Sequence, residues 1–205
     1  MGLKFSIPYQ IPFYETDITH HVKLPHLLAF SLQVSGMQSE SLGNTDKDVF
    51  DNYGLVWIVT DYAIEIDRLP RYNEKVTITT EAISYNKIFC YRNFYITDEA
   101  GQQIMLFKTT FALMDYETRK VAEVPDEVVA PYGADKIKKL LRGPRYKTLE
   151  NPLEILYRVR YFDLDMNGHV NNSKYLEWML DVFDLDFLTE YTPCLLYTSP
   201  SPRDT

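Results

Sequence analysis

Apolar and polar residues alternate along several stretches of the first two thirds of the chain, with the period of β-strands. The alternating stretches are 5–13, 55–66, 75–84, 89–97 and 103–114. Turn-forming residues separate them, as in the Asp-Glu-Ala-Gly run at 98–101. Residues 25–42, between the first two stretches, predict a helix. One strand, one helix and four further strands predict an α+β domain whose antiparallel sheet curls around the helix.

The beginning of this pattern recurs without gaps 148 positions later (155 minus 7). Asp17, His21 and Leu28, for example, align with Asp165, His169 and Leu176. In each copy an alternating strand, 155–161 in the second, leads into a polar loop and then a helix. The apolar residues of the second helix fall on one face, and Asn172 or Ser173 can cap its start. A repeat of this kind predicts two domains of one fold in tandem.

The repeat divides the chain into four segments. We expect an N-terminal domain at 1–130, a linker with a short basic helix at 131–151, and the start of a second, incomplete domain at 152–193. Residues 194–205 show neither helical nor strand periodicity, and CLLYTSPSPRD matches the translation of a common sequencing-library adaptor. We interpret this segment as an artefact, which removes Cys194 as a candidate nucleophile. The alternative is a disordered tail rich in Ser and Pro.

Composition and charge narrow the class of protein. A hydrophobic content of 45% predicts a packed core, and the net charge of −8 argues against a general nucleic-acid binder. No apolar run is long enough to span a membrane, so we expect a soluble, cytoplasmic protein. Two cysteines and no Cys/His cluster predict neither a disulfide framework nor a metal site.

The candidate chemistry lies in the second copy, at Asp165-x-Asn167-x-His169 just before a helix. Histidine can move protons near neutral pH, an amide can orient water or a carbonyl group, and the free amides of a helix start can stabilise an oxyanion. The first copy has Asp17, Thr19 and His21 instead, so it lacks the amide. We therefore expect one active copy. Cys90, within an aromatic strand, is interpreted as packing rather than as a nucleophile.

The sequence YFDLDMNGHVNNSKYLEWMLD at 161–181 resembles the signature of the acyl-acyl carrier protein thioesterases of bacteria and plant plastids. YETD at 14–17, LGN at 42–44 and GLVWIVTDYAIEIDRLPRYNEKVTI at 54–78 resemble the N-terminal domain of that family. The resemblance implies tandem hot-dog domains, an acyl pocket shaped largely by the N-terminal domain, and hydrolysis of fatty acyl carrier protein without a cofactor. It also implies that Asn167 and His169 are catalytic and that Asp165 supports them. A further catalytic Cys or Glu would fall within 194–205.

A basic cluster in the linker suggests a docking site for the acidic carrier protein, and its members are Lys136, Lys138, Lys139, Arg142, Arg145 and Lys147. A solvated helix face is the alternative. Two other functions also fit the sequence: hydrolysis of acyl-CoA, because hot-dog folds act on both substrate classes, and acyl binding without catalysis by an inactive fragment. Chain-length preference and oligomeric state do not follow from the sequence.

Overall fold

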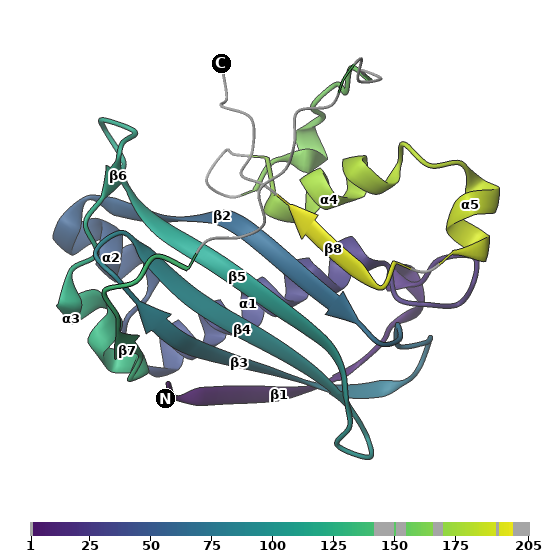
Figure 1. The fold of residues 1–205 in the computed structure, drawn as a ribbon, viewed down its shortest axis with the longest axis horizontal. Helices are drawn as coiled ribbons and strands as arrows, with labels where there is room; N and C mark the ends of the chain where they lie inside the picture. Colours follow the sequence, from purple (N-terminus) through teal and green to yellow (C-terminus); the bar gives the residue numbers. More distant parts are fainter. Residues whose placement is uncertain (1, 142–149, 151–154, 166–169, 192, 199–205) are drawn as a thin grey trace.

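The centre of the molecule is one antiparallel sheet, which is shown in Figure 1. The computed structural model describes residues 2–141, 150, 155–165, 170–191 and 193–198. The main strands run in the order β1-β3-β4-β5-β2-β8. Their bounds are Lys4–Gln10 (β1), Leu55–Ile66 (β2), Lys75–Tyr85 (β3), Phe89–Asp98 (β4), Gln103–Asp115 (β5) and Leu195–Thr198 (β8). Two short strands, β6 (Val121–Ala122) and β7 (Asp135–Lys136), pair with β5 and β3. The five long strands predicted from alternation are therefore confirmed.

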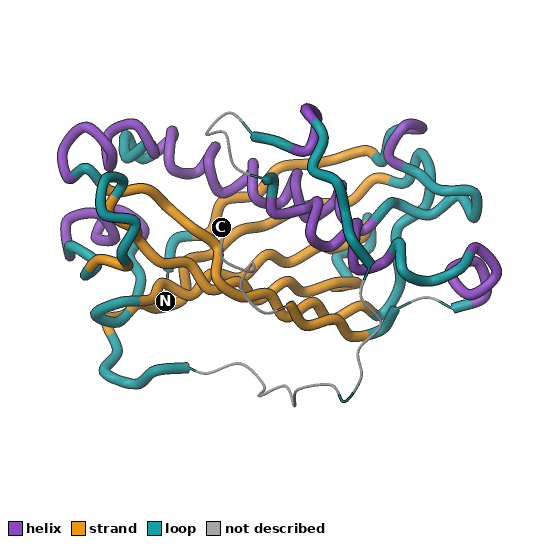
Figure 2. Tube along the Cα trace, turned by 90° about the horizontal axis from the view of Figure 1, so that it is seen from above, coloured by secondary structure: helices purple, strands orange, loops and turns teal. Residues whose placement is uncertain are grey.

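Helix α1 (Leu24–Ser41) lies along one face of the sheet, as Figure 2 shows. Pro25 suits its first turn, where a backbone N–H has no helical acceptor, and Leu27, Leu28 and Val34 on its inner face are fully buried. The other helices are α2 (Asp46–Tyr53), α3 (Asp126–Val129), α4 (Asn172–Leu180) and α5 (Leu185–Glu190). The described residues also form three 3₁₀ turns, η1 (Phe13–Glu15), η2 (Ala130–Tyr132) and η3 (Tyr161–Asp163). A helix within a curled antiparallel sheet is the predicted α+β architecture.

The alternation pattern did not predict α2, although its start carries a recognisable local signal. Thr45 caps the helix, and the carboxylate of Asp48, three residues later, accepts a hydrogen bond from the Thr45 N–H at 2.8 Å. Gly54 ends the helix with a φ of 67°, in the left-handed region that glycine adopts without strain. The capping residues, rather than the apolar spacing, define this helix.

The internal repeat is visible in the local structure of both copies. Turns η1 and η3 begin at 13 and 161, and helices α1 and α4 begin at 24 and 172, so both pairs keep the offset of 148. Before each helix a backbone bond closes the loop, from Lys23 N to Glu15 O at 2.7 Å and from Asn171 N to Asp163 O at 2.8 Å. The two copies therefore fold alike where both are described.

Three expectations differ from the structure. Residues 195–198, within the segment that showed no strand periodicity, form β8 and pair with β2. Residues 155–160 form no strand, although their alternation matches that of β1. Strand β1 is held by antiparallel pairing with β3, whereas no described strand pairs with 155–160, and an unpaired strand has no partner for its backbone groups. The predicted basic helix is also absent from the described part of the linker, where 133–141 contain β7 and bends instead. The rest of that linker lies largely outside the described residues.

Candidate functional site

A cavity of about 680 Å³ lies between the C-terminal half of α1 and the sheet. Leu32, Ser35, Gly36 and Ser39 of α1 form one wall, and residues of β2, β3, β4 and β5 form the opposite wall. Apart from its chain neighbours and the backbone of its own helix, no atom lies within 4 Å of the position that a Cβ of Gly36 would take, so there is open space beside the helix at this point. The volume is typical of pockets that hold a small molecule.

The second copy closes part of the same cavity. Asp165, Val170, Asn172 and Tyr175 line it together with residues of the N-terminal unit. A backbone bridge between Leu164 and Val170 fixes the two ends of the intervening loop. Of the predicted site residues, Asp165 is therefore placed at the cavity, whereas Asn167 and His169 lie outside the described residues.

The start of α4 also faces this cavity. Asn171 caps the helix, and its Oδ1 accepts hydrogen bonds from the Ser173 N–H at 3.0 Å and from the Ser173 Oγ at 2.9 Å. The N–H of Asn172 has no acceptor in the described part of the chain, and Asn172 lines the cavity. A helix start carries partial positive charge, so the cavity wall presents a group suited to a developing negative oxygen.

The equivalent loop of the first copy is fully described and shows a different use of its polar residues. Oδ1 of Asp17 accepts hydrogen bonds from the Thr19 N–H at 2.8 Å, the Thr19 hydroxyl at 2.7 Å and the His21 N–H at 3.2 Å. The hydroxyl of Thr19 also lies 2.9 Å from His21 Nδ1. None of the three residues lines the cavity. Their bonds hold the loop itself, which supports a structural role for this copy.

Cys90 and Trp57 both line the cavity. Burial raises the pKa of the Cys90 thiol to about 12, so the thiol stays protonated at neutral pH, in agreement with a packing role. Trp57 lines the cavity and meets the ring of Phe111 edge to face, with 6.2 Å between centroids. The Trp57 side chain is also packed against the buried cluster that contains Val49 and Leu113, so it belongs both to the cavity wall and to the core.

Sequence reasoning did not single out Arg92, which also lines the cavity. Only 8% of this residue is exposed, and its guanidinium donates hydrogen bonds to Gln38 Oε1 at 2.6 Å and Thr80 Oγ1 at 2.8 Å. One sequence feature could have identified Arg92 as a candidate: it lies on the inward-facing side of an aromatic strand, where residues are normally apolar.

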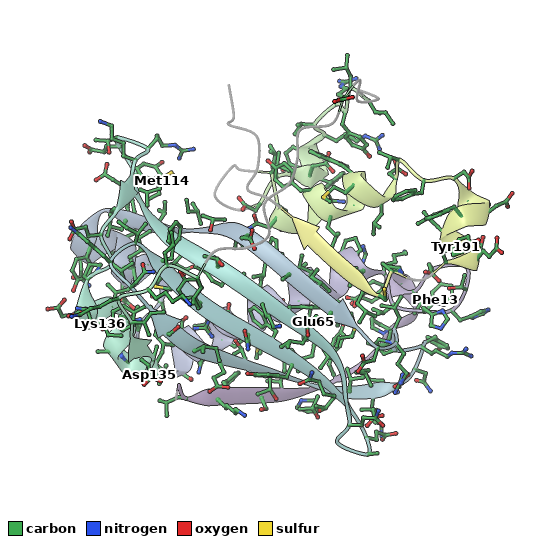
Figure 3. The ribbon with its side chains drawn as sticks, in the orientation of Figure 1. Phe13, Glu65, Met114, Asp135, Lys136 and Tyr191 are labelled. Atoms are coloured by element: carbon green, nitrogen blue, oxygen red, sulfur yellow. The ribbon has the colours of Figure 1, made fainter. Side chains whose placement is uncertain are left out.

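Lys136, the first member of the basic cluster, lies at the same end of the sheet as Met114, a residue of the cavity wall, as Figure 3 shows. The ammonium group of Lys136 lies 2.7 Å from the Asp126 carboxylate, so its charge is paired within the chain. Lys138 and Lys139 are exposed and form no ion pair with the described residues. Arg142, Arg145 and Lys147 lie outside the described residues.

No helix among the described residues is long and apolar enough to cross a membrane. No group of three or more His, Cys, Asp or Glu side chains in that part of the chain could hold a metal ion.

Comparison with known proteins places these features in a family. The model of the acyl-ACP thioesterase N-terminal domain matches residues 2–132, and the model of the acyl-ACP thioesterase C-terminal domain matches residues 146–197. A chloroplastic acyl-acyl carrier protein hydrolase of Cuphea viscosissima is 26% identical over 196 residues, which cover 87% of this chain and 47% of that protein. The chain thus spans about half the length of the curated relatives it matches.

Solved structures agree with this match. A presumed oleoyl thioesterase from Lactobacillus plantarum is 35% identical and superposes with a TM-score of 0.89, over 96% of this chain and 77% of that one. The 12:0-ACP thioesterase from Umbellularia californica, at 21% identity, has the same fold, with a TM-score of 0.74 over 89% of this chain and 77% of that one. The predicted hot-dog architecture is therefore confirmed. Because the N-terminal family model alone matches more than half of the residues, the chain belongs to the acyl-acyl carrier protein thioesterase family.

Proposed function

We propose that the chain is part of an enzyme that hydrolyses fatty acyl-acyl carrier protein to a free fatty acid and the carrier, without a cofactor, in fatty acid biosynthesis. The observation that carries this proposal is the cavity shared by the two copies. It has room for an acyl chain beside α1, and the ends of the Asp165–Val170 loop line it next to the positive start of α4. The relatives named above as hydrolases and thioesterases support the same reaction.

In the proposed reaction a water oxygen attacks the thioester carbonyl carbon and the carbon–sulfur bond then breaks. The start of α4 stabilises the carbonyl oxygen as it becomes negative. His169 takes the proton from water and returns it to the leaving thiolate, Asn167 orients the water or the carbonyl group, and Asp165 supports them. Hydrolysis by this route consumes only water.

The two copies provide a matched pair of variants that tests this assignment. His169→Ala should lower the rate of hydrolysis by about 10²-fold or more, because a positioned general base contributes at least that much. His21→Ala, at the equivalent position of the first copy, should leave the rate within about twofold. Steady-state release of free thiol from acyl carrier protein measures both rates. Retention of full activity by His169→Ala would refute the role of His169.

The carrier is the second part of the proposal. The exposed Lys138 and Lys139 would attract an acidic carrier protein to the sheet end beside the cavity, whereas Lys136 is already paired with Asp126. Hydrolysis of acyl-CoA is the alternative reaction. Assays of one acyl chain on both carriers distinguish the two, and a marked preference for CoA would reject the carrier-protein assignment. A carrier-protein substrate would also fit the cytoplasmic location that we expect.

A further inference from the structure

Helix α1 contains a glycine, Gly36, where the helix borders the cavity. Glycine within a helix is unfavourable, because it loses more backbone freedom on folding than any other residue. Two structural needs can require it nonetheless: a left-handed backbone conformation, or a neighbour so close that no Cβ fits. The chain has an example of each, since Gly54 has a φ of 67° and a Cβ on Gly2 would collide with the Ala82 carbonyl oxygen.

Gly36 meets neither of these needs. It lies within α1 and is not among the glycines with a positive φ. No atom beyond its own helix backbone and chain neighbours lies within 4 Å of the position of a Cβ. An alanine would therefore fit here without strain and would favour the helix. The glycine thus leaves space empty at the expense of helix stability.

The empty space at Gly36 belongs to the cavity. Leu32, four residues earlier, and Ser39, three residues later, line the cavity as Gly36 does. Residues at these spacings share one face of a helix. A side chain at position 36 would therefore extend into the space between α1 and the sheet and reduce the volume open to a ligand.

The sheet opposite α1 provides an apolar surface. Val59, Phe111 and Cys90 occupy paired positions on the neighbouring strands β2, β5 and β4, and all three line the cavity. Neighbouring strands are roughly 5 Å apart, so this row extends about 10 Å across the sheet. A hydrocarbon chain lying on the row would contact one continuous apolar surface.

The hydroxyl groups of the α1 wall do not require a polar ligand. Ser35 Oγ donates a hydrogen bond to the Leu32 carbonyl oxygen at 2.6 Å, and Ser39 Oγ lies 2.7 Å from the Tyr132 hydroxyl. Because these groups are satisfied within the protein, an apolar chain can lie against them without leaving a buried donor unpaired. Both walls are therefore compatible with an unsubstituted acyl chain.

We propose that Gly36 is a specificity-determining residue, which keeps open the volume that the longest acyl chains need. The proposal rests on the function given above and deepens it, because it names the position that sets the upper limit of chain length. A side chain at position 36 would exclude the last methylene groups of a long chain, and the free energy of burying them would be lost. A short chain would still fit.

Binding of non-hydrolysable analogues tests the proposal independently of catalysis. Acyl-pantetheine amides with straight saturated chains of increasing length would be titrated into the protein and followed by calorimetry. The affinity should rise with length up to the longest chain that fits. Gly36→Leu should weaken binding of that longest chain at least about tenfold and leave the short chains within about twofold. An unchanged length profile in Gly36→Leu would overturn the proposal.

Gly36→Ala distinguishes a space for ligand from a structural glycine, and it tests the proposal even if Gly36→Leu does not fold. It should shift the length profile in the same direction by a smaller amount. It should also raise the midpoint of thermal unfolding by about 2–4 °C, because alanine favours the helix. A lower midpoint would show that packing requires the glycine and would overturn the proposal.

Gln33→Leu is the matched control, because Gln33 is exposed on the same helix and does not line the cavity. It should keep the length profile of the unchanged protein. The same shift in Gln33→Leu as in Gly36→Leu would reject the role of Gly36. Failure of the His169 test with these binding results intact would reject the hydrolysis proposal alone.

Discussion

At the scale of single residues, His26 shows how packing between the copies affects a titrating group. It is partly buried on the first turn of α1, which packs against α4. Burial lowers its pKa and the nearby Lys23 lowers it further, while the charges of Glu177 and Lys174 on α4 act in opposite directions. The folded protein therefore holds the neutral form of His26 more readily than the unfolded chain does.

This shift predicts a dependence of stability on pH. Above the ordinary histidine pKa of about 6.5, His26 is neutral in both states and has no effect. As the pH falls below that value, the unfolded chain binds the proton first, so the free energy of unfolding decreases. His26→Gln should reduce this loss. Thermal unfolding of both proteins from neutral to mildly acidic pH measures the difference, and parallel curves would contradict the prediction.

At the scale of elements, α4 belongs to the second copy by sequence but packs into the core of the first. Leu176, the counterpart of Leu28, is 1% exposed and lies in one cluster with Leu28, Phe94 and Phe107. Other apolar side chains of the second copy remain exposed, among them Phe162 and Leu185. Helix α4 is therefore stabilised mainly through its contact with α1 and the first core.

Shortening the side chain that makes this contact should lower the free energy of unfolding. Leu176→Ala removes a fully buried side chain, and we expect it to lower the free energy of unfolding by about 2–4 kcal/mol. Met179→Ala, on the same helix but 40% exposed, should cost less than about 1 kcal/mol. Denaturant titration of both variants measures these values. Similar losses for the two would mean that α4 does not depend on the core contact.

At the scale of the whole molecule, the charge distribution matters for the proposed carrier. The chain has a net charge of −8, so the exposed Lys138 and Lys139 form a local positive site on an acidic protein. Strand β7, which ends two residues before Lys138, pairs with the end of β3 at Ser84 and Tyr85. Lys75 begins β3, at the opposite end of that strand, and Arg71 precedes it by four residues. An acidic carrier would approach the first pair and avoid most other surfaces.

Charge reversal distinguishes docking from simple solvation. Lys138→Glu with Lys139→Glu should raise KM for acyl carrier protein severalfold and leave KM for a short acyl-pantetheine thioester unchanged, because only the carrier contacts that surface. Arg71→Glu with Lys75→Glu changes the net charge equally and should have little effect on either substrate. Equal changes in KM for both substrates would remove the docking assignment.

The sequence by itself determined the elements and their repetition, because strand alternation, helix spacing and capping residues act over a few neighbours. The five long strands, α1, the start of α4 and the offset of 148 all followed from such local signals. Only the tertiary structure decided which strands are paired, which side chains pack into the core and which buried groups have a counter-charge. Residues 155–160 alternate like β1 but form no strand without a pairing edge, Leu176 packs into the core of the first copy, and Arg92 is buried without a counter-charge beside a cavity. Each of these outcomes depends on groups that are distant in the sequence, and burial and pairing are set only when the chain brings such groups together.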